Sequence, residues 1–487
     1  MNFADIIRRH AEGVPDNIAL HFAAKDTSYR QLWHHIEAAT EALLSQGVKP
    51  GDRVAWLGLN DPKMIVLLFA LARLGAILLP LNYRLAPAEI QAILDHAEAG
   101  FLLADPTYQP TADALKVPAA RGLSEVTPGE DKPVLLVYTS GTTGKPKGAL
   151  HTQAGLLANC VESQHAHGFT PQDHILTALP MFHVGGLCIQ TLPALSAGAQ
   201  VTIHARFDAD TWLHDVQTRR PTMSLLVPAT LRAVISNPRF PSADLSSLQL
   251  LNAGSSPVPV SLIDAFHQRG IPVCQVYGTT ETGPVSIYLQ RHEAMRHAGS
   301  AGRAGVNVNV RLVDESGADV SLGQIGEIWL RAPNLMREYW RDPHNPSFQN
   351  GWFHTGDLAR CDEDGFYWVA GRSKDMIISG GENIYPAEIE NILADCPQIA
   401  EAAVLGVPDE RWGEAAVAVV VLAPGARLSA GDVLQLLEGK LARFKHPRQV
   451  VFVEVLPKTA LGKVQKSELA RSFAQSPRQI TSLSKPA

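Results

Sequence analysis

One segment of the chain combines glycines, hydroxyls and lysines in the way that a polyphosphate site requires. It covers residues 138–148, with the sequence YTSGTTGKPKG, and follows an apolar run. Three glycines let the backbone turn with its N–H groups inward, while four hydroxyls and two lysines supply further donors and positive charge. We therefore predict that this segment holds the phosphates of a nucleotide. The residues expected to do so are Thr139, Ser140, Gly141, Thr142, Thr143, Gly144 and Lys147.

This segment differs from a Walker A loop in two respects. The spacing from Gly141 to Gly144 is too short, and Lys145 precedes a proline rather than a serine or threonine. A P-loop kinase or ATPase is therefore disfavoured. Composition alone would equally fit a solvated Gly/Ser/Thr loop, but the complete string is too specific for that interpretation.

Further segments match, in order, the motifs of one known family. Residues 138–148 resemble the phosphate loop of the acyl-adenylate-forming superfamily, which includes acyl- and aryl-CoA ligases, peptide-synthetase adenylation domains and beetle luciferases. Segments similar to the other motifs of this family lie at residues 180–186, 277–283, 355–357, 371–384 and 457–463. Six ordered motifs identify the chain as a member, with surroundings most similar to the 4-coumarate and fatty acid CoA ligase branch.

The resemblance implies a reaction in two halves. A carboxylate attacks the α-phosphorus of ATP and expels pyrophosphate, and the thiol of coenzyme A then attacks the acyl-adenylate and releases AMP. A carboxylate is a poor electrophile and AMP is a good leaving group, so adenylation makes the second half feasible. In the first half the protein must position two anions and offset their repulsion, so positioning and electrostatics should dominate.

The resemblance also implies roles for residues around the nucleotide. Glu281 is the expected Mg²⁺ ligand, because a hard cation prefers oxygen ligands, and Thr280 should contact the α-phosphate. Tyr277 offers an aromatic face for adenine. Asp357 should accept hydrogen bonds from both ribose hydroxyls, with Arg372 near the same sugar. Three further positions are expected to bind the nucleotide: Gly254, Ser255 and Gly278.

Two lysines are expected to control the two half-reactions. By resemblance, Lys463 bridges the attacking carboxylate and the phosphates of ATP, and Lys374 stands at the hinge about which a small C-terminal domain rotates. One orientation places Lys463 in the site. The other brings up residues 379–384, with Gly380 and Gly381 along the pantetheine path.

The sequence is least informative about the acid. The resemblance places His183 near the acyl carboxylate and the floor of its pocket. No Asp follows His183 as in amino-acid-activating relatives, and Val276 stands where malonate-type ligases have an arginine, so amino acids and dicarboxylates are disfavoured. An apolar pocket with small walls predicts a fatty or aromatic acid. Its expected walls are Gly185, Gly186, Gly254, Gly278, Pro284 and Val285.

Strands and helices must alternate to position these motifs. Apolar runs that are typical of buried strands lie at residues 134–138, 174–179, 201–204, 223–227, 248–251 and 273–277. Helix-like stretches such as 208–218 and 259–269 lie between them, which predicts α/β layers with mainly parallel sheets. We interpret the apolar run at 65–81 as one buried core helix.

The pattern changes after about residue 300. Short strands with Gly and Asp turns come first, and residues 362–365 (DEDG) are interpreted as a hairpin turn rather than an acidic metal site. A compact α+β unit then follows, with helices predicted at 386–394 and 430–442. The expected organisation is an N-terminal adenylation domain at residues 1–371, a hinge at 372–374 and a mobile C-terminal domain at 375–487.

Composition excludes several other classes of protein. The 487 residues are 46% hydrophobic and 18% charged, which supports a large core and argues against global disorder. The net charge of −6 predicts no nucleic-acid surface. Five scattered cysteines without a CxxC argue against a disulfide framework or thiolate zinc site, and His165 and His167 are interpreted as surface residues rather than metal ligands. With no apolar leader or integral membrane segment, a cytoplasmic location is expected.

The predicted function is thus an ATP- and Mg²⁺-dependent acid–CoA ligase. Three alternatives stay open: a ligase that loads a carrier protein, a luciferase-like oxygenase and a non-catalytic nucleotide-binding relative. No carrier-like domain follows Lys463, which weakens the peptide-synthetase version of the first. The second needs a special acid, and intact Lys463, Glu281 and Asp357 argue against the third. Nothing in the sequence indicates an oligomeric state.

Overall fold

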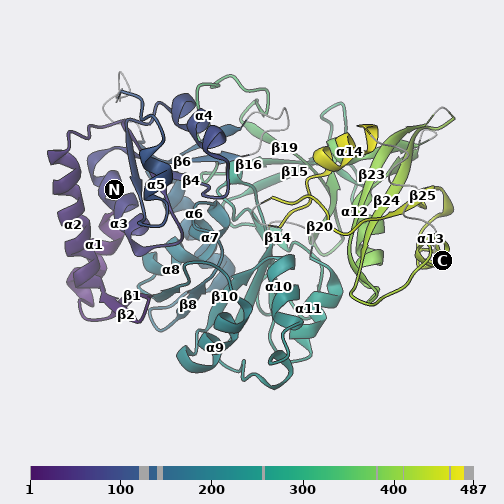
Figure 1. Cartoon of the computed structure of the whole chain (residues 1–487), viewed down its shortest axis with the longest axis horizontal. Helices are drawn as coiled ribbons and strands as arrows, with labels where there is room; N and C mark the ends of the chain where they lie inside the picture. Colours follow the sequence, from purple (N-terminus) through teal and green to yellow (C-terminus); the bar gives the residue numbers. More distant parts are fainter. Residues whose placement is uncertain are drawn as a thin grey trace.

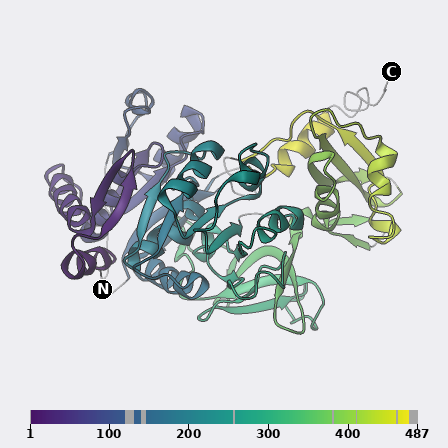
Figure 2. The same ribbon diagram turned by 90° about the horizontal axis from the view of Figure 1, so that it is seen from below.

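The computed structural model of the chain describes residues 2–119, 131–139, 146–254, 258–379, 382–409, 411–459 and 462–475. Most of the chain forms one large body, and the part that follows β20 (Tyr367–Arg372) forms a smaller unit beside it (Figures 1 and 2). The described residues contain four sheets, of which the fourth belongs to the smaller unit.

The largest sheet has nine strands in the order β14-β13-β12-β11-β10-β8-β9-β1-β2. Its strands are β1 (Ile18–Phe22), β2 (Lys25–Ser28), β8 (His174–Thr177), β9 (Gln200–Ile203), β10 (Met223–Leu226), β11 (Leu250–Gly254), β12 (Val273–Tyr277), β13 (Ile287–Tyr288) and β14 (Arg303–Ala304). Neighbours from β12 through to β1 are parallel, and the antiparallel pairs lie at the edges. Each apolar run predicted between residues 174 and 277 overlaps one of these strands, which confirms the mainly parallel arrangement.

A second sheet has six strands in the order β17-β7-β6-β4-β3-β5. Its strands are β3 (Arg53–Leu57), β4 (Ile77–Leu81), β5 (Phe101–Ala104), β6 (Pro133–Thr139), β7 (Lys147–Thr152) and β17 (Glu338–Tyr339). The helices around both sheets include α1 (Asp5–Gly13), α2 (Tyr29–Ser45), α3 (Pro62–Leu74), α4 (Pro87–Ala97), α6 (Gln153–His167), α9 (Ala209–Arg219), α10 (Pro228–Ile235) and α11 (Val260–His267). The largest core cluster joins α1, α2 and α3 to strands of both sheets.

The apolar run at 65–81 is a helix followed by a strand, so the prediction of a single core helix is wrong in its second half. Helix α3 starts at Pro62, where the Asp61 side chain accepts from the Lys63 N–H, and ends at Gly75 with φ +71°. A left-handed glycine stops a helix, and the chain then enters β4 between β3 and β6. No helix in the described segments has the length and apolarity needed to cross a bilayer.

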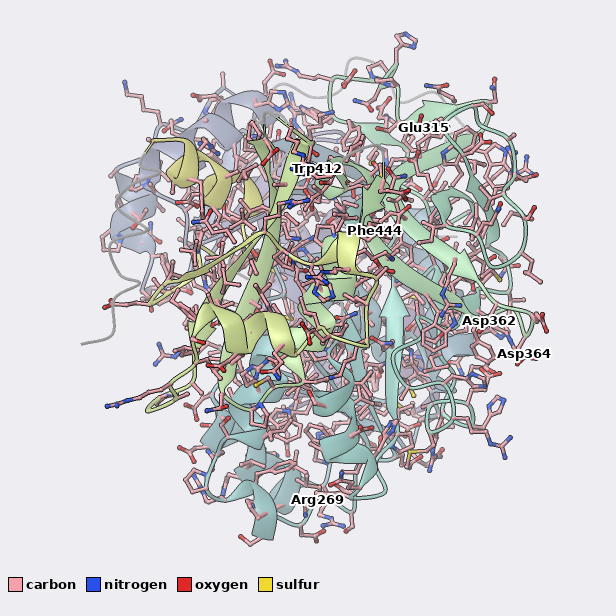
Figure 3. All side chains as sticks on the ribbon, turned by 90° about the vertical axis from the view of Figure 1, so that its right-hand side faces the viewer. Arg269, Glu315, Asp362, Asp364, Trp412 and Phe444 are labelled. Carbon is pink, nitrogen blue, oxygen red and sulfur yellow. The ribbon has the colours of Figure 1, made fainter. Side chains whose placement is uncertain are left out.

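A third sheet, in which all described strand pairs are antiparallel, forms the last part of the large body. Its strands are β15 (Asn309–Val313), β16 (Gly326–Arg331), β18 (Phe348–Gln349), β19 (Trp352–Cys361) and β20. The acidic residues Asp362 and Asp364 lie on the hairpin turn between β19 and β20 (Figure 3). Asp362 Oδ2 accepts from Trp368 Nε1 at 2.7 Å, and the described residues contain no His/Cys/Asp/Glu group suited to a metal. The hairpin interpretation is confirmed.

The smaller unit contains the fourth sheet and three helices. Its elements are β21 (Ile377–Ser379), β22 (Glu382–Ile384), α12 (Pro386–Ala394), β23 (Ile399–Asp409), β24 (Gly413–Leu422), α13 (Ala430–Gln435), β25 (Gln449–Phe452) and α14 (Lys466–Gln475). Helix α12 has the predicted bounds, but α13 ends seven residues before the predicted 442. Beyond Gln435 the chain forms i→i+3 turns and reaches Gly439 at φ +71°, so apolar spacing continues without a regular helix.

Candidate active site

A chain of three side chains joins the largest sheet to the third sheet. Tyr277, the last residue of β12, donates its hydroxyl to Asp357 Oδ2 at 2.9 Å, and Arg372 Nε lies 2.7 Å from Asp357 Oδ1. Asp357 and Arg372 are direct partners across β19 and β20. The Asp357 carboxylate raises the pKa of Arg372, and burial raises the pKa of Tyr277 well above its usual value. The buried Asp357 carboxylate is thus held between a phenol hydroxyl and a guanidinium.

The backbone around Asp357 departs from regular strand geometry. The Thr355 hydroxyl donates to the Ile328 carbonyl at 2.7 Å and accepts from the Asp357 N–H at 3.0 Å. Between them, Gly356 adopts φ +69°, and the ladders on both sides of this stretch shift register. Such irregularities bend a strand and re-aim its side chains. The Thr-Gly-Asp triplet is therefore an irregular segment within β19 rather than a simple turn.

Glu281 lies in a separate group that faces the phosphate-loop hairpin. It belongs to the 3₁₀ turn η3 (Thr280–Thr282), and its Oε1 accepts from the Tyr339 hydroxyl at 2.9 Å. The Nζ of Lys147, at the start of β7, lies 4.9 Å from the centre of the Tyr339 ring. Burial raises the pKa of Tyr339, and the Glu281 charge raises it further, so the hydroxyl stays a donor. A carboxylate, a phenol and an ammonium thus converge, with Thr280 buried beside them.

Two predicted glycines lie where no side chain fits. A Cβ on Gly254 would come 2.6 Å from the Val276 carbonyl oxygen, and one on Gly278 would come 2.2 Å from that of Pro284. Gly254 ends β11 and Gly278 follows β12, so both lie at the C-terminal ends of parallel strands, where ligands of open α/β sheets bind. They let the neighbouring backbone of Val276 and Pro284 pack closely at the edge that also carries Tyr277.

His183 is fixed in one tautomer by the helix that it caps. Its Nδ1 accepts the Gly185 N–H at 3.0 Å at the start of α7 (Val184–Gly186), so the proton of the neutral ring is on Nε2. Burial lowers the pKa of His183 to about 4, and the charge of Lys463 contributes to the lowering. The ring is therefore neutral at pH 7 and can donate one hydrogen bond from Nε2.

Lys463 belongs to the small unit but reaches the residues of the large body. Thr459 holds its loop, with Thr459 N–H donating to the Lys463 carbonyl at 2.7 Å and Lys463 N–H donating to Thr459 Oγ1 at 3.2 Å. Next to it, Gly462 at φ +77° packs so closely that an added Cβ would lie 3.0 Å from Ala229 Cβ of α10. Partial desolvation lowers the pKa of Lys463, Arg372 lowers it further, and Asp357 opposes them. Lys463 is nevertheless exposed to solvent.

The structure thus brings together most of the predicted residues that it describes. Thr139 and Lys147 face each other across the β6–β7 hairpin. Lys374 lies exposed in the 3₁₀ turn η4 (Ser373–Asp375) between the large body and the small unit. Outside the described residues lie Ser140, Gly141, Thr142, Thr143, Gly144, Ser255, Gly380 and Gly381.

Sequence reasoning missed Tyr339 and misplaced His167. Tyr339 comes from the two-residue strand β17, 58 positions after the Glu281 that it contacts, and no local motif marks it. His167 is buried rather than on the surface, since its Nδ1 bonds the Ser163 carbonyl at 2.7 Å on the inner face of α6. Burial lowers the pKa of four histidines to about 4, and we call them the low-pKa histidines: His151, His167, His174 and His183.

Comparison with known families decides the identity of this arrangement. The family model described as AMP-binding enzyme matches residues 7–340, and that of the AMP-binding enzyme C-terminal domain matches residues 388–463. The chain belongs to the AMP-binding enzyme family. This confirms the family predicted from the six motifs, and the two matched regions fall in the large body and the small unit. The residue roles and the boundaries at 371 and 375 stay predictions.

Relatives of this AMP-binding enzyme align with nearly its whole length. An indoleacetate–CoA ligase from Aromatoleum aromaticum is 46% identical and covers 98% of this chain and 99% of its own. A feruloyl-CoA synthase from an Amycolatopsis species is 40% identical over 96% of this chain and 98% of its own. The O-succinylbenzoate coenzyme A synthetase of Bacillus subtilis, solved with ATP and a magnesium ion, is 32% identical, covers 95% of this chain and 98% of its own, and superposes with a TM-score of 0.85.

Proposed function

We propose that this AMP-binding enzyme is an ATP- and Mg²⁺-dependent acid–CoA ligase that activates an aromatic acid. It makes an acyl-adenylate with release of pyrophosphate, and then an acyl-CoA thioester with release of AMP. The aligned relatives named for indoleacetate and feruloyl-CoA support an aromatic acid over a fatty one. The apolar cluster of Leu179, Leu225, Val276 and Val285 beside the His183 loop supports an acid without a second charge.

The nucleotide half of the site follows from the Tyr277–Asp357–Arg372 chain. Asp357 has one buried carboxylate with lone pairs left for two ribose hydroxyls, because Tyr277 and Arg372 occupy one site on each oxygen. Tyr277 offers its ring to the adenine at the C-terminal end of β12. The ion pair with Arg372 and the hydrogen bond from Tyr277 hold the Asp357 carboxylate in place.

The phosphate half of the site lies between Glu281 and the hairpin that carries Lys147. Glu281 has its second oxygen as a ligand for Mg²⁺, since Tyr339 holds the first. Mg²⁺, when bound there, neutralises phosphate charge. Thr280 contacts the α-phosphate, and Lys147 with the loop before it holds the β- and γ-phosphates until pyrophosphate leaves.

One observation carries the proposal: Lys463 of the small unit lies within electrostatic range of both His183 and the Asp357–Arg372 pair. The acid carboxylate and the α-phosphate are both anions, so bringing them together requires a cation at that point. Lys463 supplies it, and the Nε2–H of His183 orients the carboxylate. The lowered pKa of Lys463 and its contact with solvent indicate a residue that enters the site from outside, rather than a member of a structural ion pair.

The second half-reaction is proposed to need a different placement of the small unit. Lys374 is the proposed pivot, because it lies exposed in the turn where the chain leaves the large body. Rotation there withdraws Lys463 and admits the thiol of coenzyme A along Gly380 and Gly381. The five cysteines are unpaired, which supports a reducing compartment such as the cytoplasm as the place of the reaction.

Pyrophosphate release with ATP and Mg²⁺ tests the proposal. The acids are indole-3-acetate, hydroxycinnamates, benzoates, malonate and fatty acids from acetate to palmitate, each with and without coenzyme A. We expect turnover with aromatic acids that rises with coenzyme A and yields the thioester. Turnover that ignores coenzyme A would favour a carrier protein as acceptor, preference for palmitate would refute the aromatic acid, and silence with every acid would refute the ligase.

A further inference from the structure

A short segment of the chain joins the turn that carries Glu281 to the hairpin that carries Lys147. It covers residues 334–340, includes β17, and we call it the connecting segment. Near its start, Met336 N–H donates to the Glu281 carbonyl at 2.7 Å. At its end, Trp340 N–H donates at 2.7 Å to the carbonyl of the residue that follows Lys147. The connecting segment is therefore hydrogen-bonded to both parts of the proposed phosphate half of the site.

The first residue of the connecting segment fixes the turn η3. The fully buried Asn334 donates from Nδ2 to the carbonyls of Thr282 and Val285, at 2.9 and 3.1 Å. The two backbones also lie close together, since a Cβ added to Gly283 would lie 2.3 Å from the Asn334 carbonyl oxygen. The turn that carries Glu281 therefore has a fixed position relative to the connecting segment.

Strand β17 fixes the hairpin side of the connecting segment. Tyr339 pairs with Ala149 of β7 in an antiparallel ladder. Arg337 N–H donates to the Leu150 carbonyl at 2.8 Å. The Tyr339 ring lies in a small buried apolar cluster that includes Ala149 and Phe353. Both the backbone and the ring of Tyr339 are therefore held against β7.

The side chain of Tyr339 contacts a charged group at each of two places. Its hydroxyl donates to Glu281 Oε1 at 2.9 Å, and the Nζ of Lys147 lies 4.9 Å from the centre of its ring. The hydrogen bond fixes one carboxylate oxygen, and the ring face attracts the ammonium. Within the described residues Glu281 Oε2 accepts no hydrogen bond. The bond from Tyr339 thus decides which oxygen of Glu281 is left for a ligand.

We propose that Tyr339 is a positioning residue that couples the metal ligand to the phosphate hairpin. Its hydroxyl orients the Glu281 carboxylate and leaves Oε2 for Mg²⁺, while its ring holds the Lys147 ammonium beside the same phosphates. This inference rests on the proposed ligase function, in which Glu281 binds Mg²⁺ and Lys147 binds the β- and γ-phosphates. The hydroxyl and the ring make separate contributions, so different substitutions remove them.

Binding of a nucleotide that cannot react, with and without Mg²⁺, tests the role of the hydroxyl. The probe is α,β-methylene-ATP, and calorimetry gives its Kd in excess Mg²⁺ and in EDTA. Tyr339→Phe removes the hydroxyl and keeps the ring beside Lys147. We expect it to lower the affinity gained from Mg²⁺ by about ten-fold, as for removal of a group that orients a metal ligand, and to change the Kd in EDTA by less than about two-fold.

Two further variants separate the ring from the hydroxyl and identify the group through which the hydroxyl acts. Tyr339→Leu also removes the ring beside Lys147, so the affinity in EDTA should fall as well, by about three-fold or more. In a Glu281→Ala background, Tyr339→Phe should have no further effect on the affinity gained from Mg²⁺, because a positioning residue acts only through the group that it orients.

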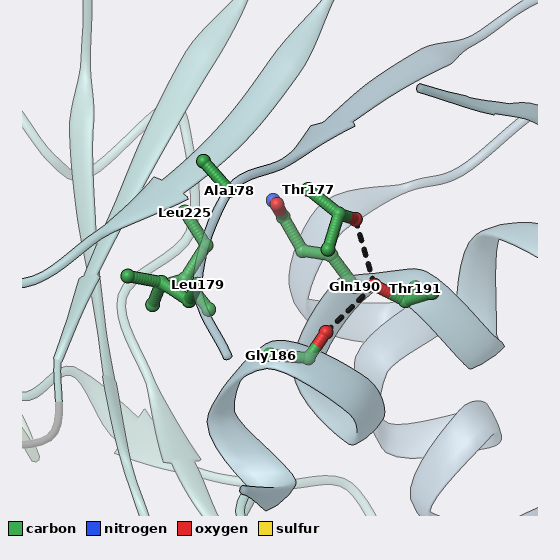
Figure 4. Close-up of a pocket in the computed structure, with 7 residues that line it drawn as sticks. All are labelled: Thr177, Ala178, Leu179, Gly186, Gln190, Thr191 and Leu225. Atoms are coloured by element: carbon green, nitrogen blue, oxygen red, sulfur yellow. Dashed lines mark hydrogen bonds between the residues drawn. The ribbon is translucent and has the colours of Figure 1, made fainter. Parts of the chain in front are cut away.

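Two buried hydroxyls elsewhere in the large body provide matched controls. Tyr288→Phe removes another phenol that donates to a carboxylate, at 3.4 Å from Glu162 Oε2. Thr177→Val removes a hydroxyl at the end of β8 that lies 2.7 Å from Thr191 Oγ1 (Figure 4). Both variants should lower the melting temperature without changing the affinity gained from Mg²⁺. A purely structural role of Tyr339 would give this same result for Tyr339→Phe.

The inference and the proposed function fail in different ways. An unchanged gain from Mg²⁺ in folded Tyr339→Phe would overturn the inference, and Tyr339→Leu provides the same test if Tyr339→Phe does not fold. A further loss caused by Tyr339→Phe in the Glu281→Ala background would also overturn it, because the hydroxyl would then act elsewhere. If the wild type binds the nucleotide no more tightly with Mg²⁺, the proposed function itself fails, and this result is distinct because it precedes any substitution.

Discussion

Asp357→Asn tests the nucleotide half of the site, because it removes a charge and keeps the shape. The Asn Oδ1 can still accept from the Tyr277 hydroxyl, so the contact at 2.9 Å need not be lost. What is lost is the ion pair with Arg372 at 2.7 Å and the charge that strengthens the two proposed ribose hydrogen bonds.

The expected loss of ATP recognition follows from these contacts. Each hydrogen bond to a charged group contributes about 1.5–3 kcal/mol, and an amide keeps one acceptor, so the loss in ATP recognition should be about 2–3 kcal/mol. That corresponds to about 30- to 150-fold in kcat/KM for ATP. The cost to stability should be smaller, about 1–2 kcal/mol, because the Arg372 side chain is 31% exposed and solvent screens its charge.

Initial rates of pyrophosphate release against ATP concentration measure this effect. The control is Asp362→Asn, which alters a carboxylate on the neighbouring turn that accepts from Trp368 outside the site. A second experiment uses 2′,3′-dideoxy-ATP. The wild type should have a low kcat/KM for this nucleotide, and Asp357→Asn should not lower that value further. An unchanged kcat/KM for ATP in Asp357→Asn, or a further large loss with the dideoxy nucleotide, would refute the assignment of Asp357 to the ribose.

Three more predictions concern the metal, the hinge and the pH. Glu281→Gln should raise the Mg²⁺ concentration for half-maximal pyrophosphate release by about ten-fold or more. Its melting temperature should not change, since Tyr339 can still donate to the amide oxygen. An unchanged dependence on Mg²⁺ would contradict the assignment of Glu281 as the metal ligand. Lys374→Pro should keep pyrophosphate release within about two-fold of the wild type and lower thioester formation by about ten-fold or more, because proline fixes φ at the pivot. Equal loss of both activities would contradict a hinge at Lys374. As the pH falls from 6.5 towards 4, each low-pKa histidine should lower the free energy of unfolding by about 1 kcal/mol per pH unit, because the unfolded chain binds a proton there that the folded chain does not. A denaturant midpoint that stays constant over this pH range would contradict the prediction.

Residues within continuous motifs could be predicted from the sequence, and those assembled across distant strands could not. Asp357 and Arg372 were expected at the ribose and Tyr277 at the adenine, and the structure joins all three in one chain of contacts. The partner of Glu281 was not foreseen, because Tyr339 comes from a strand with no motif and reaches Glu281 only through pairing with β7.

Local patterns also failed where apolar spacing continued through a change of structure. The run at 65–81 stays apolar across Gly75, but the left-handed glycine ends the helix and a buried strand follows. His167 was expected on the surface because no metal partner lay nearby, yet its helix turns it inward onto Ser163. Burial depends on what packs over a helix face, and a short histidine pattern does not contain that information.

Lys463 is proposed to join the acid carboxylate to the phosphates in the first half-reaction. Lys463→Ala should be compared with Lys440→Ala, which removes an exposed lysine of the same unit, in pyrophosphate release and in thioester formation from supplied acyl-adenylate and coenzyme A. We expect Lys463→Ala to lose the first by about 100-fold or more, as for removal of a preorganised charge, and to keep most of the second. Wild-type pyrophosphate release in Lys463→Ala would contradict this role of Lys463.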